Sequence, residues 1–232
     1  MSGLADRIAV VTGAAGGLGS HITNALLSAG ARVVGTSRSI DASGIGDERF
    51  VGIPADLTTT AGARAVAERT MERFGQIDAL VHVAGGFAGG SPIHETGDDT
   101  WDVMINLNLR AGIHILSAVI PHMRGRGRGS IVAIGSRAAV EPAANIGAYS
   151  ASKAALVSLV RTAALENRDL GITANVILPG TIDTEQNRRA DPKADRSQWV
   201  SPEKLAALAV YLVSDAGAQI TGAAIPFYGA GL

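Results

Sequence analysis

A tyrosine and a lysine four residues apart are the side chains in this sequence whose spacing could do chemistry. Tyr149 and Lys153 lie at the start of an apolar segment that runs to about residue 167. Residues four apart share one face of a helix, one turn apart. An ammonium group beside a phenol favours the ionised phenol, so such a tyrosine could exchange a proton near neutral pH. The alternative is an ordinary surface pair, and the rest of the chain has to decide between them.

Composition places the chain among globular proteins and excludes several classes of function. It has 232 residues, of which 47% are hydrophobic and 18% charged, so one α/β domain over residues 1–232 can bury a sizeable core. The net charge of −1 gives no electrostatic reason to expect a nucleic-acid or membrane partner. The absence of cysteine excludes disulfides and thiol catalysis. The five histidines show no metal-ligand spacing, so we expect no metal site.

No segment is expected to cross a membrane or to act as a signal peptide. No uninterrupted apolar stretch reaches the roughly 18 residues of a membrane span, and Asp6 and Arg7 interrupt the N-terminus before any apolar run. We therefore predict a cytoplasmic protein. The alternating arginines and glycines of residues 124–129 are expected to form a solvated loop after a helix.

A cluster of glycines separates the first predicted strand from the first predicted helix. An apolar run at residues 7–11 is followed by Gly13, Gly16, Gly17 and Gly19, then by a helical pattern and a second apolar run at residues 31–36. A phosphate can approach the backbone closely at such a turn, where free N–H groups and the helix dipole favour an anion. This arrangement predicts a dinucleotide-binding βαβ unit, although the spacing Gly13-x3-Gly17-x-Gly19 departs from the strict G-x-G-x-x-G pattern.

The residues after the second strand favour a cofactor that carries a phosphate on the ribose 2′-oxygen. At this position an acidic residue would hold the ribose 2′-hydroxyl of NAD, and an arginine would accommodate the 2′-phosphate of NADP. The chain has Arg38 there, flanked by Ser37 and Ser39, and no acid. We therefore expect NADP(H) in preference to NAD(H). The alternative is a solvated Arg38 in a loop.

Strand and helix patterns alternate along the rest of the chain. We predict strands at residues 7–11, 31–36, 50–54, 77–83, 129–135, 172–178 and 223–228. We predict later helices from the N-cap Thr58 to about residue 74, and at residues 98–123, 149–167 and 202–214. This alternation predicts a doubly wound Rossmann fold, with a mostly parallel seven-stranded sheet and helices on both faces. Residues 181–200 are polar and irregular, and we expect them to close over a substrate.

These features resemble the short-chain dehydrogenases/reductases over nearly the whole chain. The shared motifs are Thr12-Gly13-x3-Gly17-Leu18-Gly19, Asp56, Ala84-Gly85, Asn108, Ser136, Tyr149-x3-Lys153 and Pro179-Gly180-x3-Thr184. Ser136 precedes Tyr149 by 13 residues, the interval usual in the family. The resemblance implies an enzyme that reduces a ketone or aldehyde, and possible substrates include 3-oxoacyl groups. It also implies a homotetramer or dimer through two long apolar helices.

The resemblance implies a role for each motif residue. Tyr149 would protonate the carbonyl oxygen, and Ser136 would hydrogen-bond it. Lys153 would lower the pKa of Tyr149 and hold the nicotinamide ribose. Asn108 would fix a water in a proton relay. Cofactor contacts beyond the glycine turn, Ser37 and Arg38 are implied for Leu18, Asp56, Leu57, Ala84, Gly85, Tyr149, Lys153, Pro179, Gly180, Ile182 and Thr184, with Asp56 near the adenine and Ile182 and Thr184 near the nicotinamide.

One departure and two alternatives stay open. The family often has two asparagines after the fourth strand, where this chain has His82 and Val83, so His82 would tie the central strands together differently. The stretches at residues 83–90 and 184–199 resemble dihydropteridine reductases locally, which favours reduction of a quinonoid pterin as an alternative substrate. A regulator that binds NADP without chemistry is the other alternative, and the complete set of catalytic residues argues against it.

Overall fold

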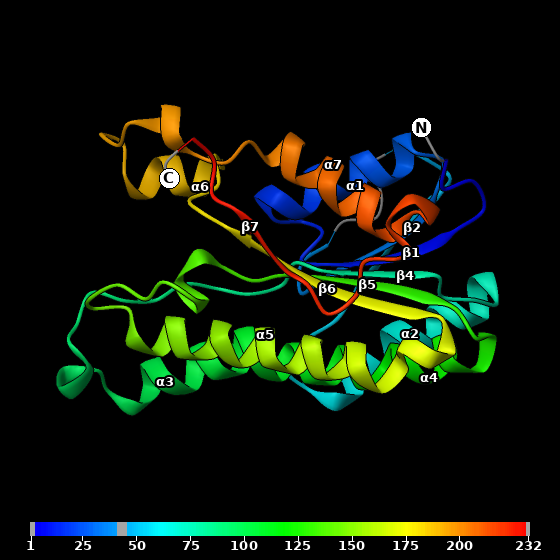
Figure 1. The fold of residues 1–232 in the computed structure, drawn as a ribbon, viewed down its shortest axis with the longest axis horizontal. Coiled ribbons are helices and arrows are strands. Elements are labelled where there is room, and N and C mark those ends of the chain that lie inside the picture. The colour runs from blue at the N-terminus through cyan, green and yellow to red at the C-terminus, as the bar shows by residue number, and fades with distance from the viewer. Residues whose placement is uncertain (1–2, 41–45, 231–232) are drawn as a thin grey trace.

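A parallel sheet between two layers of helices forms the protein (Figure 1). The computed structural model describes residues 3–40 and 46–230. The strand order is β3-β2-β1-β4-β5-β6-β7, and every neighbouring pair is parallel. The strands are β1 (Ile8–Thr12), β2 (Arg32–Ser37), β3 (Phe50–Pro54), β4 (Ala79–His82), β5 (Gly129–Ile134), β6 (Ile172–Pro179) and β7 (Ala224–Phe227). The predicted doubly wound fold is confirmed.

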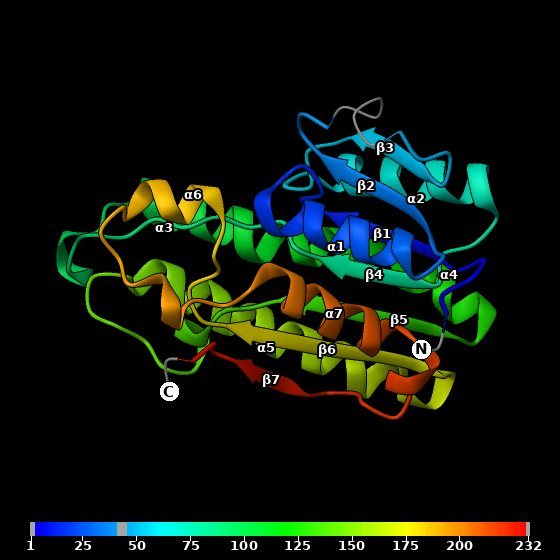
Figure 2. The same ribbon diagram turned by 90° about the horizontal axis from the view of Figure 1, so that it is seen from above.

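Helices cover both faces of the sheet, as Figures 1 and 2 show. On one face lie α1 (Gly17–Ser28) and α7 (Pro202–Val213). On the other lie α2 (Thr60–Phe74), α4 (Ala111–Arg126) and α5 (Gly147–Asn167). Two shorter helices, α3 (Asp98–Ile105) and α6 (Glu185–Ala190), complete the set.

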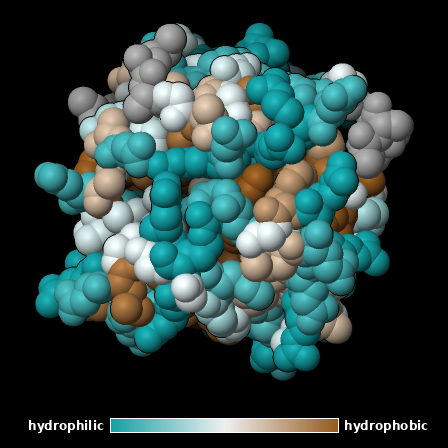
Figure 3. All heavy atoms as spheres, turned by 90° about the vertical axis from the view of Figure 1, so that its right-hand side faces the viewer, coloured by the Kyte–Doolittle hydropathy of each residue, from teal (hydrophilic) through white to brown (hydrophobic). Residues whose placement is uncertain are grey.

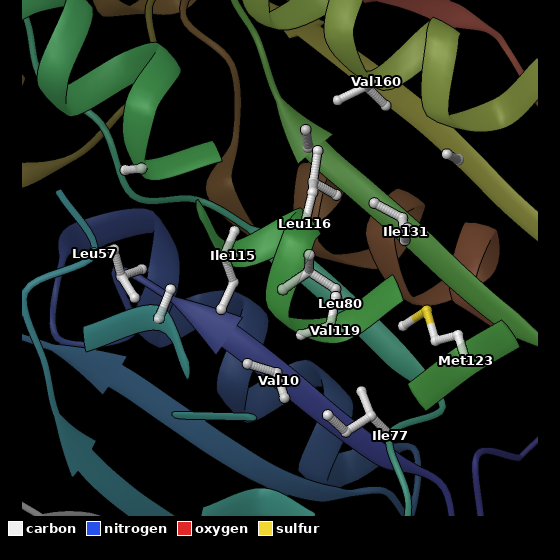
Figure 4. Packing of buried hydrophobic residues seen from close by; sticks show 14 of the residues in the cluster. Val10, Leu57, Ile77, Leu80, Ile115, Leu116, Val119, Met123, Ile131 and Val160 are labelled. Atoms are coloured by element: carbon white, nitrogen blue, oxygen red, sulfur yellow. The ribbon is translucent and has the colours of Figure 1, made fainter. Parts of the chain in front are cut away.

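Apolar side chains on both sides of each central strand bury the sheet. Val10, Leu80 and Ile131 pack against α2, α4 and α5 (Figure 4), whereas Val11 and Val81 pack against α1 and α7. Strands buried on both faces carry continuous apolar runs, which is why the strands were visible in the sequence.

The order of the strands fixes where a ligand can bind. The chain leaves β3 at one edge of the sheet and returns to β4 beside β1, so the direction of winding reverses between β1 and β4. Ligands of open α/β sheets bind at the carboxyl ends of the strands at such a point. Residues 84–97 and 181–200 extend beyond this end of the sheet (Figure 2). The opposite end, seen in Figure 3, is covered mainly by hydrophilic side chains.

Several predicted boundaries were wrong for local reasons. The hydroxyl of Thr59, not Thr58, caps α2 by accepting a hydrogen bond from the Gly62 N–H, because Thr58 bonds to Asp56 instead. The predicted helix at residues 98–123 extends to residue 126 and contains one π-helical turn, η3 (Asn106–Arg110). The segment at residues 181–199 is not wholly irregular, because Thr184 caps the short helix α6.

The arginine–glycine run is not the solvated loop that we predicted. Arg124 and Arg126 belong to the last turn of α4. Arg124 donates to Asn167 Oδ1 at 2.9 Å, and Arg126 donates to the buried carboxylate of Asp78 at 3.0 Å. Asp78 also accepts from the Ile8 N–H at 2.8 Å. Both arginines therefore connect α4 to neighbouring elements.

The continuous helix from residue 98 to 126 is long and apolar enough, by length and composition, to cross a membrane. In this fold its α4 part packs against the sheet, α2 and α5. The core helix of a globular protein has the same composition, so the helix needs no membrane to account for it.

Candidate active site

The end of β5 brings three of the predicted catalytic side chains together. Ser136 follows this strand after Gly135, and its hydroxyl is hydrogen-bonded to the Tyr149 phenol. Lys153, one turn further along α5, donates from Nζ to the Ile134 carbonyl at 3.0 Å. Tyr149 is half-buried, whereas Lys153 is buried. The tyrosine and lysine are therefore not a surface pair.

Asn108 joins the turn after β4 to α5. Its Oδ1 accepts from the Gly86 N–H at 2.9 Å, and its Nδ2 donates to the Gly86 carbonyl at 3.0 Å and to Ser152 Oγ at 3.0 Å. The side chain is fully buried in the π-helical turn. These bonds explain the polar break in an apolar helix, and π-turns often occur at functional sites. The water that Asn108 would fix stays a prediction.

Ser152 is a site residue that the sequence analysis missed. It is fully buried, accepts from Asn108, and donates to the Tyr149 carbonyl at 2.7 Å. Its polarity on the same stretch of α5 as Tyr149 and Lys153 was the available signal. It holds the first turn of α5 against Asn108.

Burial sets the protonation states of Tyr149 and Lys153. It raises the pKa of Tyr149 above its ordinary value, and the hydrogen bond from Ser136 opposes this only in part. It lowers the pKa of Lys153 to about 8. Burial and Ser136 account for this shift of the Tyr149 pKa, so the predicted lowering of that pKa by Lys153 stays a prediction. At neutral pH the phenol keeps its proton and Lys153 keeps its charge.

The buried Lys153 makes the stability of the fold depend on pH. Its pKa is about 8 in the fold against 10.5 ordinarily, so between these values the unfolded chain binds more protons and stability rises with pH. From pH 7 to pH 10.5 we expect wild type to gain on the order of 3 kcal/mol in free energy of unfolding relative to Lys153→Met. Urea denaturation of both proteins measures this difference. Equal pH dependences would contradict a buried ammonium group.

The glycine turn between β1 and α1 has the geometry of an anion cradle. Gly13 has a left-handed φ of +66°, and a Cβ there would lie 3.0 Å from the Ala84 nitrogen. A Cβ on Gly19 would lie 2.0 Å from the Gly13 carbonyl oxygen. Gly16 is the N-cap of α1, and the first turn carries no acidic residue. The free N–H groups there fit a pyrophosphate.

Two segments distant in the sequence close around this turn. A Cβ on Gly17 would lie 3.0 Å from Thr184 Cβ. A Cβ on Gly85 would lie 2.7 Å from Asn108 Oδ1 and 3.2 Å from Lys153 Nζ. The glycine turn, the turn after β4, and Thr184 are therefore one continuous site, and it reaches Lys153.

Five other predicted cofactor contacts have different surroundings. Ile182 is half-buried and pairs with Val200 in a β-bridge, so it lies beside Thr184. The side chains of Leu18 and Leu57 are buried in the two cores. Pro179 ends β6, and the Gly180 N–H donates to the Phe227 carbonyl at 3.2 Å.

The ends of β2 and β3 carry the residues predicted to distinguish the cofactors. Ser37 Oγ is buried and has no hydrogen-bond partner in the part of the chain that the structure describes. Arg38 is exposed beside it. Hydrogen bonds from Thr58, then the charge of Arg38, lower the pKa of Asp56. An unpaired hydroxyl next to an exposed arginine fits a phosphorylated ribose.

His82 ties the central strands together, as we predicted, and Thr12 is its unpredicted partner. Thr12 Oγ1 lies 2.9 Å from His82 Nδ1 and accepts from the Val83 and Ala84 N–H groups at 3.0 Å each. Burial, and secondarily the charge of Lys153, lowers the pKa of His82 to about 3, so the imidazole is neutral. The pair fixes the Gly13 turn against the turn after β4.

Comparisons with known proteins agree with this geometry. Residues 7–195 match the short chain dehydrogenase family. The short chain dehydrogenase adrF of Penicillium rubens is 33% identical, with 97% of each chain covered. A rhamnolipids biosynthesis 3-oxoacyl-(acyl-carrier-protein) reductase of Pseudomonas aeruginosa is 34% identical, with 97% of this chain and 96% of that protein covered.

A solved structure is similar over the whole fold. L-sorbose reductase from Gluconobacter frateurii, complexed with NADPH and L-sorbose, is 29% identical and has a TM-score of 0.89, with 98% of this chain and 97% of that chain covered. Fold, motifs and relatives agree. The chain belongs to the short-chain dehydrogenase/reductase family and is an oxidoreductase.

Proposed function

We propose that the protein reduces a ketone or aldehyde to an alcohol with NADPH. The observation that carries this proposal is the hydrogen-bonded Ser136–Tyr149 pair beside the buried Lys153, at the point where the glycine turn meets the strand ends. A 3-oxoacyl reductase relative and an NADPH-bound sorbose reductase support the reaction class and the cofactor.

In this mechanism the chain positions the carbonyl oxygen and supplies its proton. NADPH, when bound, supplies a hydride to the carbonyl carbon. The Tyr149 phenol donates its proton to the oxygen, and the Ser136 hydroxyl donates a hydrogen bond to the same oxygen as negative charge develops. The Lys153 ammonium stabilises the phenolate that forms. The raised pKa of Tyr149 suits a group that must hold its proton until the reaction.

An assay of NADPH oxidation with ketones, 3-oxoacyl thioesters and quinonoid dihydropterin tests this function. We expect turnover of carbonyl compounds. Turnover of the pterin alone would favour the dihydropteridine reductase alternative, and cofactor binding without turnover would favour the regulator. Asp195 lies in one of the two stretches that resemble dihydropteridine reductases. It accepts a hydrogen bond from the Ser197 N–H at 2.9 Å, so it has a structural role within its own loop.

Arg38 is proposed to select NADPH over NADH. Arg38→Asp would place a negative charge beside the 2′-phosphate and remove its ion pair, so we expect the ratio of kcat/KM for NADPH to that for NADH to fall about 100-fold. Steady-state kinetics with both cofactors measure the ratio. The matched control is Arg64→Asp, an exposed arginine of α2. An unchanged ratio in Arg38→Asp would show that this arginine does not contact the phosphate.

We also propose a homotetramer or dimer through the outer sides of α4 and α5, and a cytoplasmic location. These helices expose Ile113 and Leu165. A second copy packed on them would bury both side chains. Analytical ultracentrifugation measures the assembly directly.

A further inference from the structure

Exposed apolar side chains gather at the end of the sheet that carries Tyr149. Of the large hydrophobic residues exposed in the described part of the chain, Phe87 (67% exposed), Ile93 (70%) and Val140 (51%) lie in the segments that follow β4 and β5. The others lie on α3, α4, α5 and α7. Exposed apolar groups next to a site favour an apolar ligand.

Phe87 touches the proposed proton donor directly. Its ring lies edge-on to the Tyr149 ring, with 5.0 Å between centroids and 74° between planes. The packing leaves most of Phe87 exposed, so the ring is available to a ligand placed at the phenol. An aromatic or flat apolar group suits such a ring face.

Close contacts at two glycines pack Ile93 and the loop that follows β4 against the start of α5. A Cβ on Gly89 would lie 2.7 Å from Ile146 Cγ2, and a Cβ on Gly147 would lie 2.9 Å from Ile93 Cγ1. Residues of the same two segments, among them Gly89, Glu95 and Gly147, line a cavity of about 130 Å³ next to this contact. The loop that carries Phe87 is thus packed on the helix that carries Tyr149.

The charged groups nearby are largely paired with one another. Arg137 pairs with Glu141, Arg188 with Asp183, and Arg189 with Glu185. Residues 183–196 contain four acidic and four basic side chains. This balance shows no excess positive charge that would attract a carboxylate or phosphate on the substrate.

We propose that the substrate is an uncharged ketone or aldehyde with an aromatic or flat cyclic apolar group beside the carbonyl, and that Phe87 selects it. The inference rests on the proposed reductase function. The apolar group lies against the ring of Phe87, with Ile93 and Val140 at the rim, while the carbonyl oxygen faces Ser136 and Tyr149.

Matched substrates test the proposal in the full chain with NADPH. We expect kcat/KM for a neutral phenyl ketone to exceed that for its para-carboxylate and for a short aliphatic ketone by about tenfold or more. In Phe87→Ala and Phe87→Leu the ratio of phenyl to aliphatic kcat/KM falls about tenfold, and in Phe87→Tyr it is retained. Tyr211→Ala, which removes an exposed aromatic side chain of α7 on the other face, leaves the ratio unchanged.

Other outcomes would overturn either the substrate class alone or the proposed function as well. A preference for the carboxylate or the short ketone, or an equal loss for all ketones in Phe87→Ala, would overturn the proposal, because Phe87 would then only position Tyr149. If wild type reduces none of the ketones while it binds NADPH, the proposed function fails and the substrate class fails with it.

Discussion

Tyr149→Phe is expected to lower kcat/KM for carbonyl reduction about 1,000-fold while NADPH binds as it does to wild type. The substitution removes only the hydroxyl that we propose as the proton donor and that is hydrogen-bonded to Ser136. The ring that packs against Phe87 stays in place. Steady-state kinetics measure the loss, and fluorescence titration measures NADPH binding.

Tyr211→Phe is the matched control, because it removes a phenol hydroxyl from an exposed position on α7. We expect its kcat/KM to equal that of wild type. A loss of less than about tenfold in Tyr149→Phe would show that another group supplies the proton.

Gly19→Ala is expected to raise the dissociation constant of NADPH at least about 100-fold and to lower the melting temperature. The added methyl group would lie 2.0 Å from the Gly13 carbonyl oxygen, so either the turn or the start of α1 must move. The N–H groups that would hold the pyrophosphate move with it. Isothermal titration and thermal denaturation measure the two effects.

Gly125→Ala is the matched control, because it shows what replacing a helical glycine by alanine does where the added methyl group meets no other atom. Gly125 lies in α4, and its added methyl group would meet nothing within 4 Å. We expect unchanged NADPH affinity and equal or slightly higher stability, because alanine favours helix over glycine. Unchanged affinity in Gly19→Ala would contradict the placement of the pyrophosphate at this turn.

The strands of the sheet, and the end of the sheet at which the candidate catalytic residues lie, could be predicted from the sequence because both depend on local patterns. Continuous apolar runs marked the strands, and parallel strands place the residues that follow them at one end of the sheet. The Tyr149–Lys153 spacing placed both on one helical turn, and the structure brings Ser136 to them.

Contacts between distant segments could not be predicted in the same way. The Thr12–His82 pair joins two strands, and the Asn108–Ser152 bond joins two helices, so neither follows from periodicity within one element. The pKa of Tyr149 depends on how deeply the phenol is buried, which the sequence does not state. The candidate catalytic groups could therefore be predicted from the sequence, whereas their hydrogen-bond partners and pKa shifts depend on the fold.

Transfer of deuterium from NADPH that carries deuterium at both C4 positions of the nicotinamide tests the central claim most directly. The account predicts that wild type produces an alcohol with one deuterium on the former carbonyl carbon, detected by mass spectrometry, and that Tyr149→Phe binds the labelled cofactor but forms this product about 1,000-fold more slowly. Bound NADPH with no labelled alcohol from any carbonyl compound, or equal rates in the two proteins, would contradict it.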